Sequence, residues 1–92
     1  MPKFRKKPIV IEAKKWLGKT TSASEIEEWT RGSGREIVWD GRTKLSVPTE
    51  EGIMTANIGD WIIKGVKGEV YPCKPDIFDA TYEEVKEGHD SI

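Results

Sequence analysis

The stretch Gly52 to Tyr82, GIMTANIGDWIIKGVKGEVYPCKPDIFDATY, decides the fold of this 92-residue chain. Its apolar runs are short and rich in β-branched and aromatic residues, and turns that contain Gly, Pro, Asn or Asp separate them. This pattern predicts three strands, over Ile53–Ala56, Trp61–Lys64 and Glu69–Pro72. Strands that follow one another through such short turns pair antiparallel. The stretch therefore predicts a β-meander.

The end of the chain predicts one more turn of helix and one more strand. The sequence Lys74-Pro75-Asp76 is typical of a helix start, because proline is tolerated at the first helical position. It predicts a single helical turn over Ile77-Phe78. Residues 81–85 then alternate in character, which predicts a last strand at the edge of the sheet.

Three further strands are predicted before the deciding stretch. The β-branched run that begins at Ile9 predicts a strand over Ile9–Ala13. The pair Asp40-Gly41 between Glu36–Trp39 and Lys44–Val47 predicts a hairpin in which both turn residues tolerate positive φ. Pro48 is expected to end the second strand of that hairpin, because proline donates no hydrogen bond to a neighbouring strand.

One full helix is predicted between the first strand and this hairpin. Ser22 and Glu25 fit the S-x-x-E capping box, in which each side chain accepts a hydrogen bond from a backbone N–H at the helix start. Ile26 and Trp29 lie three residues apart and are expected to share the buried face. The helix is expected to end at the glycines that follow, Gly32 and Gly34.

Together these elements predict an α+β fold in one domain, residues 1–92. The fold is an antiparallel β-meander of roughly six short strands with one short helix packed on it, and such a sheet can curve strongly into a small, partly open barrel. The basic arm 1–7 and the tail 87–92 are expected to be flexible. Most of the four tryptophans are expected to be buried: Trp16, Trp29, Trp39 and Trp61.

The net charge of −1 conceals two ends of opposite sign. Residues 1–19 carry seven cations and one anion, a net +6, whereas residues 76–92 carry six anions and one cation, a net −5. These ends can neutralise each other, attract a second copy of the chain or recruit different partners. Together with exposed strand edges, they favour a homodimer.

Compartment and redox state follow from what the sequence contains. The one cysteine, Cys73, forms no internal disulfide, and no apolar run approaches membrane-spanning length. These features predict a cytoplasmic protein without membrane association.

Lys74 and a helix start beside Cys73 would lower the pKa of the thiol. A nucleophile also needs a base, however, and the only histidine is His89 in the tail. A small packed residue is therefore the favoured interpretation of Cys73.

Three segments resemble a widespread family of small, uncharacterised phage and prophage proteins. They are Lys3–Ala13 (KFRKKPIVIEA), Pro48–Ala56 followed by Gly59–Gly65, and Gly68–Phe78 followed by Ala80–Glu83. They occur in the same order as in that family and cover roughly half of the chain. The resemblance implies a phage or prophage origin and expression in the cytoplasm of a bacterial host. It implies no particular activity, substrate or catalytic residue.

Two turns are the candidate ligand-binding positions. The sequence Gly59-Asp60-Trp61 is favoured as a structural turn, with the alternative that Asp60 and Trp61 line a ligand groove. Lys64 and Lys67 flank a glycine-bracketed hairpin tip where cations and backbone N–H groups can meet phosphate, although a solvated turn is the favoured interpretation. If a ligand binds, the residues expected to hold it are Asp60, Trp61, Lys64 and Lys67, with Arg5 and Lys7 assisting.

The favoured function is a non-enzymatic, phage-encoded accessory protein that binds or sequesters a host protein or a small phosphorylated ligand. No catalytic residue, metal ligand or cofactor is predicted. One alternative is a small enzyme acting on a nucleotide or another metabolite, with Asp60, Glu69 or Tyr71 as acid or base. A second is nucleic-acid binding through the basic arm, against which the near-neutral total charge argues.

Overall fold

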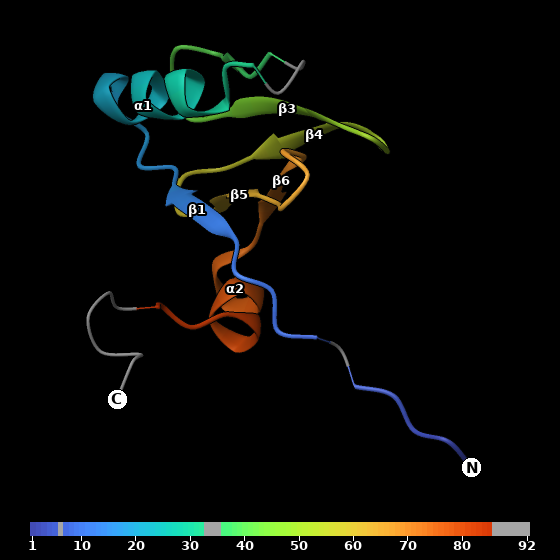
Figure 1. Ribbon diagram of the computed structural model, residues 1–92. Helices are drawn as coiled ribbons and strands as arrows, with labels where there is room; N and C mark the ends of the chain where they lie inside the picture. The colour runs from blue at the N-terminus through green and yellow to red at the C-terminus, as the bar shows by residue number, and fades with distance from the viewer. Residues whose placement is uncertain (6, 33–35, 86–92) are drawn as a thin grey trace.

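The computed structural model describes residues 1–5, 7–32 and 36–85. Within them the chain forms two three-stranded antiparallel sheets and two helices (Figure 1). The elements are β1 (Glu12–Lys15), α1 (Thr20–Thr30), β2 (Val38–Trp39), β3 (Leu45–Thr49), β4 (Gly52–Ala56), β5 (Trp61–Lys64), β6 (Val70–Cys73) and α2 (Pro75–Thr81). The predicted α+β fold with six short antiparallel strands is confirmed. The two sheets stay open, and in this part of the chain no helix is both long and apolar enough to cross a membrane.

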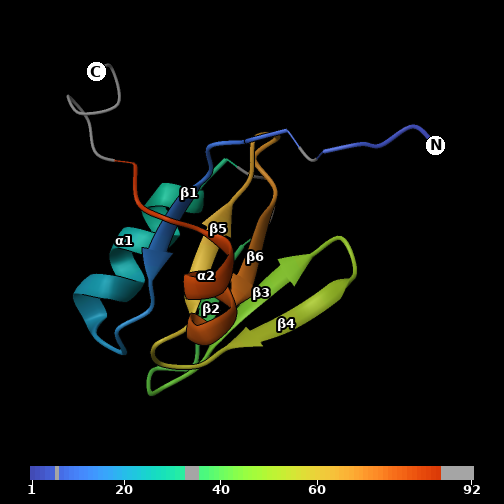
Figure 2. The same cartoon turned by 90° about the horizontal axis from the view of Figure 1, so that it is seen from below.

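The two sheets have the strand orders β2-β3-β4 and β1-β5-β6 (Figure 2). The meander runs through β2, β3 and β4, crosses to the second sheet, and continues in the β5–β6 hairpin. The turn of residues 57–60 makes this crossing, so it lies between the two sheets. Strand β1 pairs with β5 from Glu12 opposite Lys64 to Lys15 opposite Trp61. It therefore forms an edge of the second sheet, beside α1.

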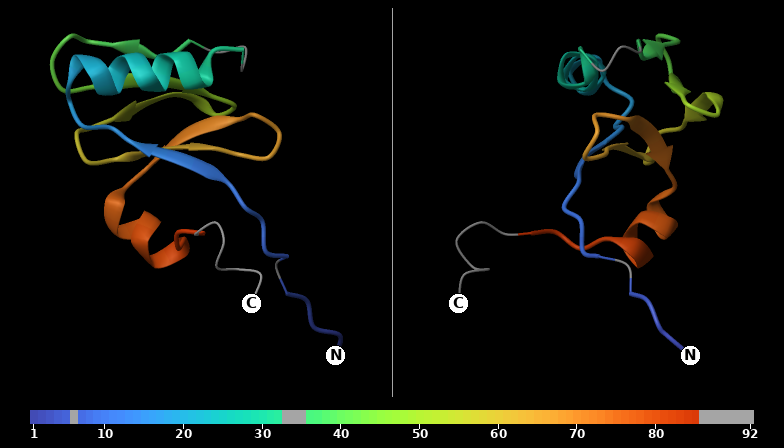
Figure 3. Two further views of the ribbon diagram at one scale, coloured as in Figure 1. Left: turned by 60° about the vertical axis from the view of Figure 1, so that its left-hand side comes forward. Right: turned by 45° about the vertical axis from the view of Figure 1, so that its right-hand side comes forward.

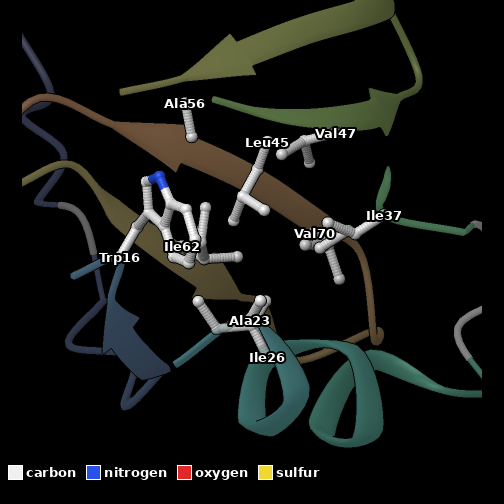
Figure 4. Packing of buried hydrophobic residues seen from close by; sticks show 9 residues of the cluster. All are labelled: Trp16, Ala23, Ile26, Ile37, Leu45, Val47, Ala56, Ile62 and Val70. Atoms are coloured by element: carbon white, nitrogen blue, oxygen red, sulfur yellow. The ribbon is translucent and has the colours of Figure 1, made fainter. Parts of the chain in front are cut away.

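The core lies between the two sheets and one face of α1 (Figure 4). Trp16, which follows β1, is completely buried, and its indole N–H donates a hydrogen bond of 2.8 Å to the carbonyl of Thr43. The Trp16 ring meets that of Trp39 edge-on with 5.9 Å between ring centroids. The buried cluster contains Trp16, Ala23, Ile26, Ile37, Leu45, Val47, Ala56, Ile62 and Val70.

The sheet β1-β5-β6 is covered on both faces. Because side chains alternate along a strand, Ile62 faces the core and α1, whereas its neighbours Trp61 and Ile63 face the other side. There α2 packs, with the Phe78 ring stacked on that of Trp61 at 4.2 Å between centroids and 11° between planes. Figure 3 shows α2 set apart from α1, with this sheet between the two helices.

The first strand was predicted too early in the sequence. β1 begins at Glu12, and the side chains of Ile9 and Val10 are 53% and 71% exposed. Glu12 pairs with Lys64, the last residue of β5, so the residues before Glu12 have no strand to pair with. The length of the partner strand, rather than β-propensity, sets where β1 begins.

The predicted helix exists, but the predicted capping box does not. α1 begins at Thr20, two residues before Ser22, and Ser22 is buried. Its hydroxyl accepts a hydrogen bond from the Leu17 N–H at 3.1 Å and donates one to the Lys15 carbonyl at 3.3 Å. Ile26 is buried and Trp29 half-buried, as their shared face predicts. The helix ends before Gly32, whose φ is +94°, whereas Gly34 lies outside the described residues.

The predicted hairpin around Asp40-Gly41 is confirmed with a different turn. Residues 40–44 connect β2 to β3, and of the predicted pair only Gly41 has positive φ, at +83°. The Asp40 carboxylate holds this loop by accepting hydrogen bonds from the N–H groups of Arg42 and Lys44 at 2.7 and 3.1 Å. These bonds lower the pKa of Asp40 below its usual value, that of Lys44 contributing most.

Pro48 lies within β3 opposite Ile53 and does not end the strand as predicted. On the other side of β3, β2 pairs only with Leu45 and Ser46. Among the described residues, no strand on that side therefore pairs with Pro48 or needs an N–H from it, which is why the strand accommodates proline.

The end of the described chain is helical for longer than predicted. α2 extends over seven residues, Pro75–Thr81, and the Tyr82 N–H still donates to the Phe78 carbonyl. The predicted strand over residues 81–85 is wrong, because Thr81 ends α2 and residues 82–85 form no regular element. The Tyr82 ring packs against Phe78 with 5.1 Å between centroids, so it stays with α2. The predicted flexible tail, 87–92, lies outside the described residues.

Candidate functional site

A shallow groove of about 280 Å³ lies between β1 and the first half of α1. Strand β1 supplies one wall, α1 the other, and Trp61 of β5 reaches it from the paired strand. Its volume is just below the range of about 300–1,000 Å³ that is usual for small-molecule sites. The lining residues are Ala13, Lys14, Lys15, Leu17, Thr21, Ser22, Glu25, Ile26 and Trp61.

The tight connection between β1 and α1 creates this groove. Gly18 in that connection has a φ of +74°, which favours glycine, and a Cβ placed there would lie 2.5 Å from Cδ1 of Ile58. The Ser22 hydroxyl ties α1 back to the backbone at Lys15 and Leu17. These local contacts hold Thr21 and the start of α1 close to the end of β1.

Two adjacent lysines of β1 stand on opposite faces of the strand at the groove. The Lys15 ammonium lies 5.8 Å from the centroid of the Trp61 ring, within the usual range of a cation–π contact. The Lys14 ammonium lies on the α1 side, 4.0 Å from the Glu25 carboxylate and 5.7 Å from the centroid of the Trp29 ring. The groove is thus lined by Lys14 and Thr21 on its α1 side, and by Lys15 and Trp61, which meet on the other face of the sheet.

Trp61 is held in place by aromatic neighbours on its α2 side. Phe78 stacks on Trp61, and Tyr82 packs on Phe78. Tyr71 lies opposite Ile63, on the same sheet face as Trp61. Burial, followed by the hydrogen-bonded neighbour Tyr82, raises the pKa of Tyr71 to about 12. Trp61 therefore presents a fixed surface to the groove.

Asp60, which the sequence offered as a ligand contact, is 3% exposed. Its Oδ2 accepts a hydrogen bond from the Asn57 N–H at 2.9 Å and pairs with the Lys74 ammonium at 3.0 Å. Gly59 before it has a φ of +96°. These contacts are those of a turn-capping residue, and Asp60 does not line the groove.

The predicted cationic residues do not gather around Trp61. The Lys64 ammonium donates a hydrogen bond of 3.2 Å to the Trp29 carbonyl, on the α1 side of the sheet. Lys67 is exposed at the tip of the β5–β6 hairpin, and Arg5 and Lys7 are exposed in the arm before β1. Of the six residues predicted to hold a ligand, only Trp61 lines the groove.

The residues proposed for acid–base chemistry also lie apart. Asp60 and Glu69 are at opposite ends of the β5–β6 hairpin, and the Tyr71 phenol meets Tyr82. Burial, Asp60 and Asp76 raise the pKa of Cys73, opposite to the lowering that a helix start and Lys74 would produce. In the described ranges, no three His, Cys, Asp or Glu side chains are placed to hold a metal ion. His89 lies outside those ranges.

Sequence reasoning missed Lys14, Lys15 and Thr21 as candidate ligand contacts. One signal was present: the two lysines immediately precede Trp16 in the strongly basic first part of the chain. The contact of Lys15 with Trp61 could not be predicted from the sequence, because it depends on the pairing of β1 with β5.

Comparisons with known protein families, with curated proteins and with solved structures gave no match for this chain. The groove therefore has to be interpreted from its own chemistry.

Proposed function

We propose that this chain is a non-enzymatic, phage-encoded binding protein that sequesters a small phosphorylated ligand of the nucleotide class in the bacterial cytoplasm. The ligand binds in the groove between β1 and α1. Lys15 neutralises its phosphate, and its flat ring lies against the exposed part of Trp61.

The observation that carries this proposal is the position of Lys15 beside Trp61 at the groove. Its ammonium is 5.8 Å from the centroid of the indole ring, so a cation and an aromatic surface are offered together. A nucleotide needs both, because its base stacks on aromatic rings and its phosphate pairs with lysine. The Thr21 hydroxyl on the opposite wall supplies a further hydrogen-bonding group.

The size of the groove favours a small ligand over a host protein. Its volume of about 280 Å³ suits a compact molecule. A stable protein complex buries roughly 1,200–2,000 Å² in total, far more surface than these nine lining residues present. The proposed phage origin comes from the resemblance of three segments to small phage and prophage proteins. A small binding protein made during infection can act by lowering the free concentration of its ligand.

The test is a calorimetric titration of the purified chain with a panel of mononucleotides and cyclic dinucleotides. We expect at least one to bind, and we expect Lys15→Met to weaken its affinity about tenfold or more, since a charge-assisted hydrogen bond contributes about 1.5–3 kcal/mol. Thr21→Ala should weaken it less, because a neutral hydrogen bond contributes about 1 kcal/mol.

The matched control is Lys44→Met, which removes an exposed lysine from the β2–β3 loop, outside the groove. This variant should bind as the unmodified chain does. A panel without any binder would refute the proposed function. Binding that Lys15→Met leaves unchanged would refute the groove as the site.

A further inference from the structure

The arm before β1, described over residues 1–5 and 7–11, presents apolar side chains together with positive charge. The side chains of Phe4 and Val10 are 94% and 71% exposed, and Ile9 is 53% exposed. Cations stand beside them in the sequence at Lys3, Arg5 and Lys7. Exposed apolar side chains that lie close together along one segment indicate a surface that a partner covers.

The exposed residues of α2 and of the segment 82–85 after it, which we call the α2 face, have the complementary composition. Ile77 and Val85 are each 56% exposed. Exposed carboxylates lie near them in the sequence at Asp76, Asp79, Glu83 and Glu84. The α2 face thus repeats the composition of the arm with the opposite charge.

Among the residues that the structure describes, no ion pair joins the charges of the arm to those of the α2 face. The ion pairs found in the described part of the chain are Lys14–Glu25 and Lys74–Asp60, and both lie outside these two surfaces. Figure 1 shows the arm leaving β1 and running outward past α2, with both at the same end of the molecule. Intramolecular neutralisation therefore stays a prediction, and the described charges of the two surfaces are available to a partner.

We infer that the arm binds the α2 face of a second copy of this chain, and that the second copy returns the same contact. Because the arm and the α2 face lie at one end of the molecule, one two-fold axis there satisfies both contacts at once. Phe4, Ile9 and Val10 then pack beside Ile77 and Val85, while lysine and arginine meet carboxylates. Reciprocal exchange gives a closed dimer.

A second copy fits the arm better than nucleic acid does. A nucleic acid offers phosphates along its whole length, and the chain's net charge of −1 opposes its approach. The α2 face offers both carboxylates and apolar side chains, which match both kinds of residue in the arm. This inference is independent of the proposed ligand, since neither surface lines the groove.

The test uses two charge-reversed variants and sedimentation equilibrium. The first carries Lys3→Glu, Arg5→Glu and Lys7→Glu, and the second carries Asp79→Lys, Glu83→Lys and Glu84→Lys. We expect the unmodified chain to have twice the monomer mass at about 0.05 M salt and to dissociate toward monomer at about 0.5 M, where screening is strong. Each variant alone should be monomeric, and an equimolar mixture of the two should restore the dimer.

The control for net charge carries Arg31→Glu, Arg42→Glu and Lys44→Glu, three exposed cations in the connections after α1 and between β2 and β3, which belong to neither surface. It should dimerise as the unmodified chain does. Circular dichroism of each variant checks that it is folded. An unmodified chain that is monomeric at low salt, or a mixture that stays monomeric, would overturn the inference. So would an arm variant that keeps the dimer and loses only binding to a labelled single-stranded DNA.

Discussion

The carboxylate of Asp60 and the ammonium group of Lys74 form an ion pair with 3.0 Å between Oδ2 and Nζ. Asp60 belongs to the turn between β4 and β5, and Lys74 directly precedes α2. The ion pair therefore connects the start of α2 to the turn in which the chain crosses between the sheets. The Asp60 side chain is 5% exposed and that of Lys74 is 53% exposed. A buried carboxylate thus depends on a partner that reaches it from the surface.

Removing the ammonium group should destabilise the fold. We expect Lys74→Met to lower the free energy of unfolding by about 1–2 kcal/mol, because the Asn57 N–H is then the remaining donor to the Asp60 carboxylate. The loss should be smaller than the roughly 3–5 kcal/mol of a fully buried pair, since Lys74 is half-exposed. Urea-induced unfolding measures this loss in the free energy of unfolding.

The control is Lys14→Met, which breaks an exposed ion pair at 4.0 Å and should lower the free energy of unfolding by less than about 1 kcal/mol. Equal losses in the two variants would contradict the assignment.

Ser22 should matter more for stability than Glu25. Ser22→Ala removes the hydroxyl that bridges the Leu17 N–H and the Lys15 carbonyl, so we expect the free energy of unfolding to fall by about 1–2 kcal/mol. Glu25→Ala loses only a long exposed ion pair and should change it by less than about 1 kcal/mol. Thermal unfolding of both variants measures the difference. Similar losses in the two would support a capping box instead of the bridge found here.

Stacking on Trp61 should contribute to the attachment of α2. Phe78→Ala removes a half-buried ring stacked at 4.2 Å, and we expect a loss of about 2 kcal/mol, below the roughly 3–5 kcal/mol of a fully buried phenylalanine. Val66→Ala at the exposed hairpin tip is the control, with an expected change of less than about 0.5 kcal/mol. Amide hydrogen exchange at Tyr82 should accelerate in Phe78→Ala, because its N–H bond to the Phe78 carbonyl closes α2. Unchanged exchange there would show that α2 is held by other contacts.

The parts of the fold that were predictable from sequence are those encoded locally. The turn at Gly59-Asp60 and the hairpin at residues 40–44 were predicted correctly because their signals are local. Their glycines adopt positive φ, and their aspartates accept hydrogen bonds from backbone N–H groups close by in the sequence. The strand ends were not predictable, since β1 begins where β5 ends and not where its β-branched residues begin. Ser22 fits a capping box in sequence, yet its bonds to the β1–α1 connection determine its role.

The candidate site was largely hidden in the sequence for the same reason. Trp61 was identified from its turn, but Lys15 becomes its neighbour only through the β1–β5 register. Lys64 and Lys67 follow Trp61 closely in sequence and lie elsewhere, because alternation along β5 turns Lys64 toward α1 and the hairpin carries Lys67 away. Proximity in sequence therefore does not bring Lys64 and Lys67 to the groove that Trp61 lines.

The Tyr71 phenol provides a pH-dependent signal from the aromatic cluster around Trp61. Its pKa of about 12 lies above the usual 10, so the folded state holds this proton more tightly than the unfolded state does. The resulting stabilisation is complete below pH 10 and is lost as the pH rises toward 12. In an ultraviolet titration of tyrosinate absorbance, we expect a step near pH 12 that Tyr71→Phe abolishes. Tyr82→Phe should lower the Tyr71 pKa while leaving it above 10, because burial is the larger cause of the shift. A Tyr71 that ionises near 10 in the folded chain would show that α2 leaves its phenol open to water.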